Sequence, residues 1–226
     1  MRRGPLRVAV LATADAAQAA SAVAAVDRWV ARRGGEVRAC APAGAPAAPR
    51  PGTYAVDAPG GATEAWIAAP LPADDESSRS AATYVAALLD DPDGPLGRAL
   101  AGPALARAWS ARVVGPARGG ALIVRVTTTP AALDAAVAAT RAVLDRLRRG
   151  PLEEASRARA VAARARGELR ASLDPRGRVA ALWRGELGAG KPAPSLDALA
   201  AFCASSLRDD ALVFVAVRPP PIAKGP

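Results

Sequence analysis

The chain has 226 residues, enough for one large domain or two small ones. A chain of this length buries roughly 70% of its unfolded surface on folding. Hydrophobic residues make up 51% of the sequence and aromatic residues only 4%, because alanine dominates the apolar residues. No apolar run approaches the ~20 residues of a membrane-spanning helix, which argues against a protein that crosses a membrane.

The formal net charge of +9 is compatible with nucleic-acid binding, but the distribution of the cations favours another explanation. Only Lys191 and Lys224 are lysines among the 30 basic residues, a bias that a GC-rich coding sequence produces together with abundant alanine. The arginines are scattered, apart from one group on a predicted helix: Arg157, Arg159, Arg164, Arg166 and Arg170. We interpret this group as a solvated helix face. The alternative is a weak anion site at Arg157, Arg164 and Arg170 that binds nucleic acid or acidic lipid.

Hydrophobic periodicity and turn residues divide the chain into predicted strands and helices. Strands are expected at 6–12, 54–57, 63–69, 109–114, 121–127 and 211–217. Helices are expected at 15–33, 77–89, 95–101, 130–149 and 151–172, and two more begin near Pro175 and Ser195. Within the strand at 63–69, we expect Trp66 to anchor the core.

The stretch from Leu105 to Gly150 organises the other elements, because it combines a hairpin with a long helix. A Gly/Pro-rich loop at 115–120 can reverse the chain between two strands rich in β-branched residues. Thr129-Pro130 then predicts a helix start, since threonine accepts the first free N–H groups and proline fits the first helical position. We therefore expect this helix to lie on the hairpin.

Hairpin pairs followed by runs of helices indicate an α+β fold, with a mostly antiparallel sheet and helices packed on one face. A Pro/Ala/Gly-rich linker at 41–52 marks the clearest boundary in the chain. We divide the chain into a strand-helix segment at 1–40, this linker, a domain at 53–218 and a tail at 219–226.

The N-terminus and the cysteines bear on the compartment. The first residues are basic and are followed by a short apolar run that Asp15 interrupts, so we expect mature, cytoplasmic protein. The alternative is an exported or periplasmic protein whose N-terminus is a signal peptide.

Cys40 and Cys203 lie far apart in the sequence. We favour two reduced cysteines over a disulfide between them, although the sequence leaves the disulfide open.

The order of elements and several local sequences resemble the C-terminal, non-catalytic half of the insulinase/pitrilysin family of zinc metallopeptidases, which includes mitochondrial processing peptidase. The resemblance is collinear and covers nearly the whole chain. It comprises LRVAVLATADAAQAASAVAAVDRWV, the P-R-P-G linker with TEAWIAAPLP, AATYVAALLDDPDGPLGRALAG with PALARAWSARVVG, GPLEEASRARAVAARARGELRASL and ALVFVAVRP. It implies a LuxS/MPP-like metallohydrolase fold, and it implies that residues 1–40 correspond to the end of a preceding peptidase half.

The chemistry of that family requires the motif H-x-x-E-H, in which two imidazoles bind zinc and a glutamate acts as the base. This chain contains no histidine, so it cannot build that site alone. The resemblance also places a substrate-gripping arginine and tyrosine in this half, but Ala101 and Arg107 occupy those positions here. We therefore assign no catalytic and no metal-binding residue, and we expect zinc only in a catalytic partner.

Two further motifs have simpler explanations. Gly185 to Lys191 imitates a phosphate-binding loop, but Pro192 replaces the hydroxyl residue that would bind magnesium, so an inter-helix loop is favoured. Asp90, Asp91 and Asp93 lack the downstream glutamate of a calcium loop and are expected to form a turn.

The sequence predicts a catalytically inactive peptidase-type domain, the structural or regulatory half of a two-lobed metallopeptidase chamber. The expected partners are a histidine-bearing catalytic chain or further copies of this chain, and peptides. The alternative function is the arginine-rich anion-binding module at Arg157, Arg164 and Arg170.

Overall fold

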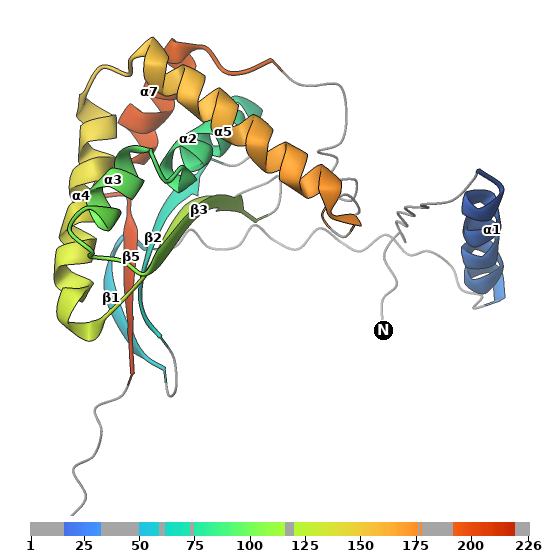
Figure 1. The fold of residues 1–226 in the computed structure, drawn as a ribbon, viewed down its shortest axis with the longest axis horizontal. Helices are drawn as coiled ribbons and strands as arrows, with labels where there is room; N and C mark the ends of the chain where they lie inside the picture. The colour runs from blue at the N-terminus through green and yellow to red at the C-terminus, as the bar shows by residue number, and fades with distance from the viewer. Residues whose placement is uncertain are drawn as a thin grey trace, which may run out of the picture. The chain divides into compact units, whose positions relative to one another are not determined.

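A computed structural model describes residues 16–32, 50–58, 62–72, 75–115, 120–175, 177 and 192–219. The chain forms two compact units, one comprising residues 1–44 and 166–191 and the other residues 45–165 and 192–226. In the first unit the structure describes helix α1 (Ala16–Arg32) and the end of helix α5 (Glu154–Leu173). All the strands and the other described helices belong to the second unit (Figure 1).

The second unit is built on a five-stranded sheet with the order β1-β5-β2-β4-β3. Its strands are β1 (Gly52–Asp57), β2 (Thr63–Leu71), β3 (Ala108–Val114), β4 (Gly120–Thr128) and β5 (Val213–Arg218). β1 runs parallel to β5, and all other neighbours are antiparallel. The α+β class is confirmed, with a sheet that is mixed because the first and last strands lie side by side in the same direction.

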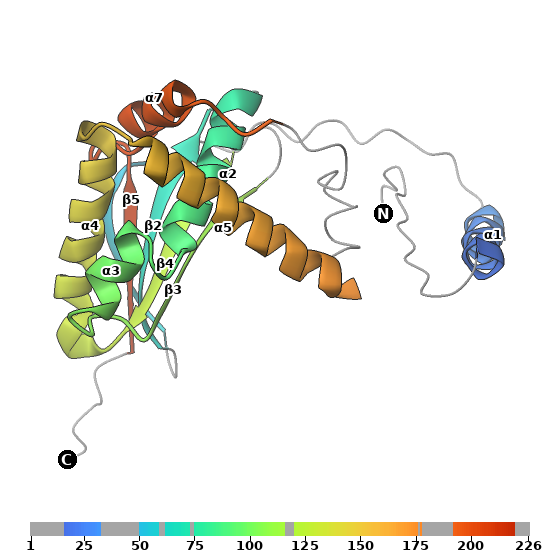
Figure 2. The same ribbon diagram turned by 45° about the horizontal axis from the view of Figure 1, so that its top comes forward.

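Helices α2 (Glu76–Asp90), α3 (Pro95–Ala101), α4 (Leu133–Arg149) and α7 (Leu196–Ser206) all lie on one face of this sheet (Figures 1 and 2). The strands alternate accordingly, so that every second residue of β2 and β4 is buried beneath the helices. Ile67, Leu122, Val124 and Val126 are each at most 1% exposed and form the sheet side of the core. Helices packed on one face are therefore confirmed.

Local sequence explains where the helices begin. The side chains of Asp75 and Ser195 accept hydrogen bonds from the backbone of α2 and α7, three residues ahead. Thr129 does the same for the short 3₁₀ turn η1 (Pro130–Ala132), which leads directly into α4. The predicted Thr-Pro helix start is thus confirmed, with a 3₁₀ turn as its first step.

Most predicted elements are confirmed with small shifts at their ends, and the predicted core position of Trp66 is wrong. β2 continues through Pro70 to Leu71, where β5 no longer pairs with it, and a strand tolerates proline where one of its sides has no neighbour. α5 begins at Glu154 instead of Pro151. Trp66 is only half buried and lies on the face away from the helices, so it does not anchor the core. The predicted strand at 6–12, most of the linker and the helix near Pro175 fall largely outside the described residues.

No helix among the described residues combines the length and apolar composition that a membrane crossing requires.

A tight connection joins α2 to α3 and requires glycine. A Cβ added to Gly97 would lie 1.9 Å from the backbone oxygen of Pro92, far closer than real Cβ atoms come to a carbonyl. The neighbouring Leu96 and Leu100 are fully buried, so α3 cannot move outward without exposing them. Glycine at this position therefore lets α3 lie close enough to the end of α2 for Leu96 and Leu100 to pack in the core.

We expect Gly97→Ala to lower the free energy of unfolding by about 1–3 kcal/mol, because the added methyl group forces backbone to move in a packed region. The measurement is urea unfolding followed by circular dichroism. Gly167→Ala is the matched control, since a Cβ there meets nothing within 4 Å and alanine favours a helix. Equal stability of Gly97→Ala and the original chain would contradict the close approach.

Candidate functional site

The sheet face opposite the helices is the most extensive candidate surface of the second unit; we call it the open face. Within the described part of the unit no helix covers it (Figure 2). The strand register places the following residues on it: Tyr54, Val56, Glu64, Trp66, Ala68, Ser110, Arg112, Ile123, Arg125, Thr127, Val213, Val215 and Val217. Most of these side chains are apolar and partly exposed. Partly exposed apolar side chains that gather on one face make it a candidate surface for contact with another molecule.

A charged cluster of Glu64, Trp66 and Arg125 lies near the centre of the open face. Trp66 and Arg125 are directly opposite each other on β2 and β4. The Arg125 guanidinium forms a two-pronged ion pair with the Glu64 carboxylate, in which Nε donates to Oε2 over 3.1 Å and Nη2 donates to Oε1. The Trp66 indole Nε1 donates to Oε2 over 2.8 Å, and the guanidinium lies 5.1 Å from the Trp66 ring centroid.

Each member of this cluster fixes the other two. Glu64 is 8% exposed, and its carboxylate is tolerated there because three N–H groups donate to it. The hydrogen bonds from Arg125 are the main reason that the pKa of Glu64 lies below its usual value, with Trp66 adding to the effect. The indole NH of Trp66 therefore has a partner on the open face, whereas the predicted position in the core would have buried it.

In the arginine group on α5, Arg159, Arg166 and Arg170 are exposed, and Arg157 and Arg164 are partly buried. The Arg157 guanidinium pairs with Glu154 at 2.5 Å, and the Arg164 guanidinium lies 5.7 Å from the centroid of the Tyr84 ring on α2. Arg170 is exposed. Two of the three arginines thus engage neighbouring side chains.

The two degenerate substrate-gripping positions lie at either end of the turn between α3 and β3. Ala101 ends α3, and its carbonyl accepts a hydrogen bond from the backbone of Ala104, whose φ of 55° is left-handed. The backbone N–H of Arg107 donates to Thr127 on β4 over 2.8 Å, and both Ala101 and Arg107 are exposed. Their role toward a substrate stays a prediction.

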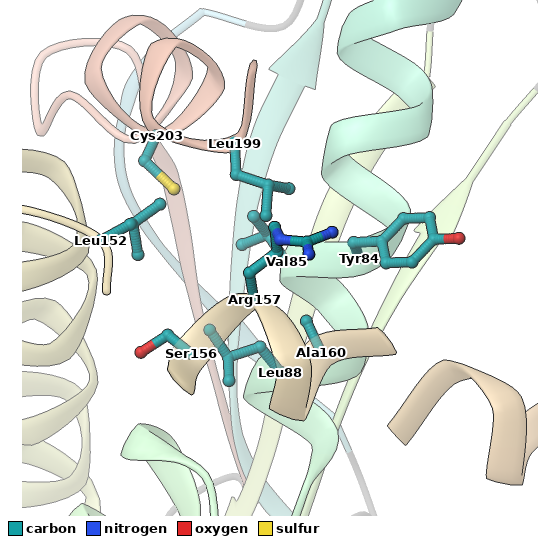
Figure 3. A pocket seen from close by; sticks show the side chains of 9 residues that line it. All are labelled: Tyr84, Val85, Leu88, Leu152, Ser156, Arg157, Ala160, Leu199 and Cys203. Carbon is teal, nitrogen blue, oxygen red and sulfur yellow. The ribbon is translucent and has the colours of Figure 1, made fainter. Parts of the chain in front are cut away.

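Figure 3 shows a small cavity between α2, α5 and α7, lined mainly by apolar side chains that include Leu88, Leu152 and Leu199. Its volume of about 10 Å³ has room for about one water molecule, too little for an organic ligand. Cys203 borders this cavity as a free, fully buried thiol, and burial raises its pKa to about 12. A thiol in this state is a poor nucleophile.

Two of the aspartates that the sequence places in a turn bind backbone groups. Asp90 accepts a hydrogen bond from the N–H of Ala111, and Asp91 accepts one from the N–H of Asp93, as expected for a turn. Among the residues that the structure describes, no group of three or more potential ligands is placed to hold a metal ion. The segment at 185–191 that resembles a phosphate-binding loop lies outside the described residues.

Glu64 should make stability depend on pH in the acid range. The pKa of a glutamate in the unfolded chain is about 4.3, and the folded-state pKa of Glu64 is lower. The pair therefore stabilises the fold fully above pH 4.3, and this contribution is lost as the pH falls through the folded-state pKa. We expect Glu64→Gln to cost about 1 kcal/mol at pH 7, since solvent around the partly exposed Arg125 screens the pair, and to flatten this part of the pH profile.

The measurement is urea unfolding of both proteins between pH 3 and pH 7. Glu153→Gln, which changes an exposed carboxylate before α5, is the control and should leave the profile unchanged. An acid-range slope that persists in Glu64→Gln would assign the pH dependence to other groups.

Comparison with known proteins relates this fold to one group of peptidases. Neither a model of a known family nor a curated protein sequence matches the chain. Among solved structures, the chain is similar to the inactive domain of an M16 peptidase from Pseudomonas fluorescens, with a TM-score of 0.65 and 16% identity over 88% of this chain and 51% of that one.

Two further structures have the same fold. The inactive peptidase domain of a Bordetella parapertussis protein described as a zinc protease has a TM-score of 0.54 and 20% identity, over 73% of this chain and 96% of that one. A Helicobacter pylori protease has a TM-score of 0.56 and 14% identity, over 74% of this chain and 44% of that one. The chain thus spans about half the length of two of these three proteins. It has the α+β fold of M16 inactive peptidase domains, and the insulinase/pitrilysin resemblance of its sequence is confirmed for the fold.

Proposed function

We propose that this chain is a catalytically inactive peptidase-type domain that forms one wall of a two-lobed metallopeptidase chamber. In this proposal a histidine-bearing catalytic chain supplies the zinc site, and the present chain supplies an interface and a surface for peptides. The fold supports the proposal, since two of the similar structures are inactive peptidase domains by their own descriptions.

The observation that carries the proposal is the absence of histidine from all 226 residues. The zinc motif of this peptidase type needs two imidazoles on one helix and a glutamate between them. Without imidazole the chain also lacks the usual general base for serine or cysteine hydrolysis. A chain with this fold and no imidazole is suited to shape a chamber and to hold a partner.

The open face is the surface that we assign to the partner or to the peptide. Val213, Val215 and Val217 form an apolar row along β5, and Ile123 extends this surface on β4. The Glu64–Arg125 pair adds one fixed charged group to this apolar background. Interfaces commonly combine an apolar centre with an arginine held in a defined position.

The chain should co-purify from native extract with a relative that contains H-x-x-E-H. In the same assay Ile123→Lys should weaken recovery of that relative at least tenfold, equivalent to about 1.4 kcal/mol, because it replaces an apolar side chain of the open face by a charge directly beside Arg112 of β3. The measurement is affinity purification followed by mass spectrometry, and circular dichroism checks that the variant is folded.

Ala138→Lys is the matched control, because it places the same charge on an exposed position of α4, on the helical side of the domain. Its recovery of the relative should equal that of the original chain. Recovery without any histidine-bearing relative would remove the proposal, and so would chelator-sensitive proteolysis by the pure chain.

The alternative anion-binding function has less support, since Arg157 and Arg164 already contact Glu154 and Tyr84. We expect no measurable binding to duplex DNA or to vesicles of acidic lipid at 50 mM salt, measured by fluorescence anisotropy and sedimentation respectively. Binding whose affinity falls steeply with added salt, and is lost in Arg157→Gln with Arg164→Gln, would reinstate this function.

A further inference from the structure

The two edges of the sheet differ in whether other described residues cover them. At the β3 edge the outward N–H of Ala111 donates to the Asp90 carboxylate over 3.0 Å, and Arg79 donates to the carbonyl of Gly115 over 2.9 Å. Side chains of α2 therefore occupy this edge, which is one way proteins prevent a further strand from adding.

The β1 edge has no such cover among the described residues. Gly52 N–H bonds to Leu212 and Ala58 N–H bonds to Arg218, which shows that the even-numbered residues of β1 face β5. The N–H and C=O groups of Thr53, Ala55 and Asp57 consequently point away from the sheet, and no backbone group in the described part of the chain pairs with them. All six residues of β1 are exposed.

We propose that a second copy of this chain occupies the edge, with the two β1 strands antiparallel and Ala55 on the two-fold axis. Ala55 then pairs with the partner's Ala55, and Thr53 pairs with the partner's Asp57. Each of these pairs exchanges both of its N–H···O=C bonds, so every outward group of β1 gains a partner. The two sheets become one continuous sheet.

Charge complementarity supports this register. The Arg141 guanidinium on α4 donates to the Thr53 hydroxyl over 3.2 Å, and it is held in place by an ion pair to Asp209 and by the Phe214 ring, whose centroid is 3.6 Å away. In the dimer the partner's Asp57 lies directly across from Thr53, on the same side of the sheet as Arg141. The two-fold symmetry places Arg141 near the partner's Asp57 twice, once on each side of the axis.

The other side of β1 is complementary as well. Tyr54 is 43% exposed and Val56 is 47% exposed, although both lie beside the valine row of β5 on the open face. The proposed register puts Tyr54 opposite the partner's Val56. Aromatic and β-branched side chains are favourable cross-strand neighbours, and the pairing extends the apolar row across the dimer. The strand is short, so we expect a modest dissociation constant, on the order of 10 µM.

Cysteine cross-linking tests the register. In a chain with Cys40→Ser, Ala55→Cys should form a disulfide-linked dimer under mild oxidation, since directly paired residues have Cα atoms about 5.5 Å apart, within disulfide range. Asp57→Cys should link to itself at least tenfold less, because two such residues would lie about 14 Å apart. A mixture of Thr53→Cys and Asp57→Cys chains should link to each other.

Sedimentation tests the dimer without a covalent bond. Ala55→Pro removes an outward N–H and keeps the bonds between β1 and β5, so it should raise the dissociation constant at least tenfold. Ala55→Thr keeps the N–H and should leave the dissociation constant unchanged.

A chain that is monomeric at 100 µM, or a dimer that Ala55→Cys does not link, would overturn the proposal. Self-linking of Asp57→Cys equal to that of Ala55→Cys would do the same, and if Ala55→Pro unfolds, the cysteine result decides. These measurements use the pure chain and are independent of any catalytic partner.

Discussion

The packing of one face of the strand pair β2–β4 against α2, α4 and α7 is the contact on which the rest of the second unit depends. These two nine-residue strands pair along their whole length, and each turns every second side chain toward the helices. β3 and β5 add to their two sides, and β1 adds to β5. The sheet could not slip by one residue without moving Ile67 and Val124 from the core to the open face.

Alanine occupies many of the buried positions in this core. Ala65, Ala69, Ala82 and Ala136 are at most 2% exposed, so each of these buried positions contributes only a methyl group to the core. The larger side chains that remain, such as Leu89, Leu96 and Leu144, then contribute a large share of the buried apolar area. A core of this kind tolerates little added volume where helices meet, as the close approach at Gly97 illustrates.

With the helices on one side of the sheet, the open face and the β1 edge are the two surfaces that we propose for contact with other molecules. The open face presents partly exposed apolar side chains around the Glu64–Arg125 ion pair, and the edge presents backbone groups with which no described residue pairs. The two surfaces are compatible, because strand addition at the edge leaves the open face exposed. A non-catalytic wall of a peptidase chamber would need both a face for its partner and an arrangement that protects its free edge from uncontrolled association.

The sequence by itself determined most of the described elements, the fold class and the absence of an imidazole site, because periodicity, helix caps and composition are local properties. Thr129, Asp75 and Ser195 begin their helices for reasons visible within a few residues. Only the tertiary structure decided which face each side chain occupies. Trp66 lies on the open face because Glu64 and Arg125, which is 61 residues from Glu64 in sequence, provide its polar partners there. Likewise only the tertiary structure placed β1 beside the last strand of the chain, because periodicity within a segment carries no information about such a distant neighbour.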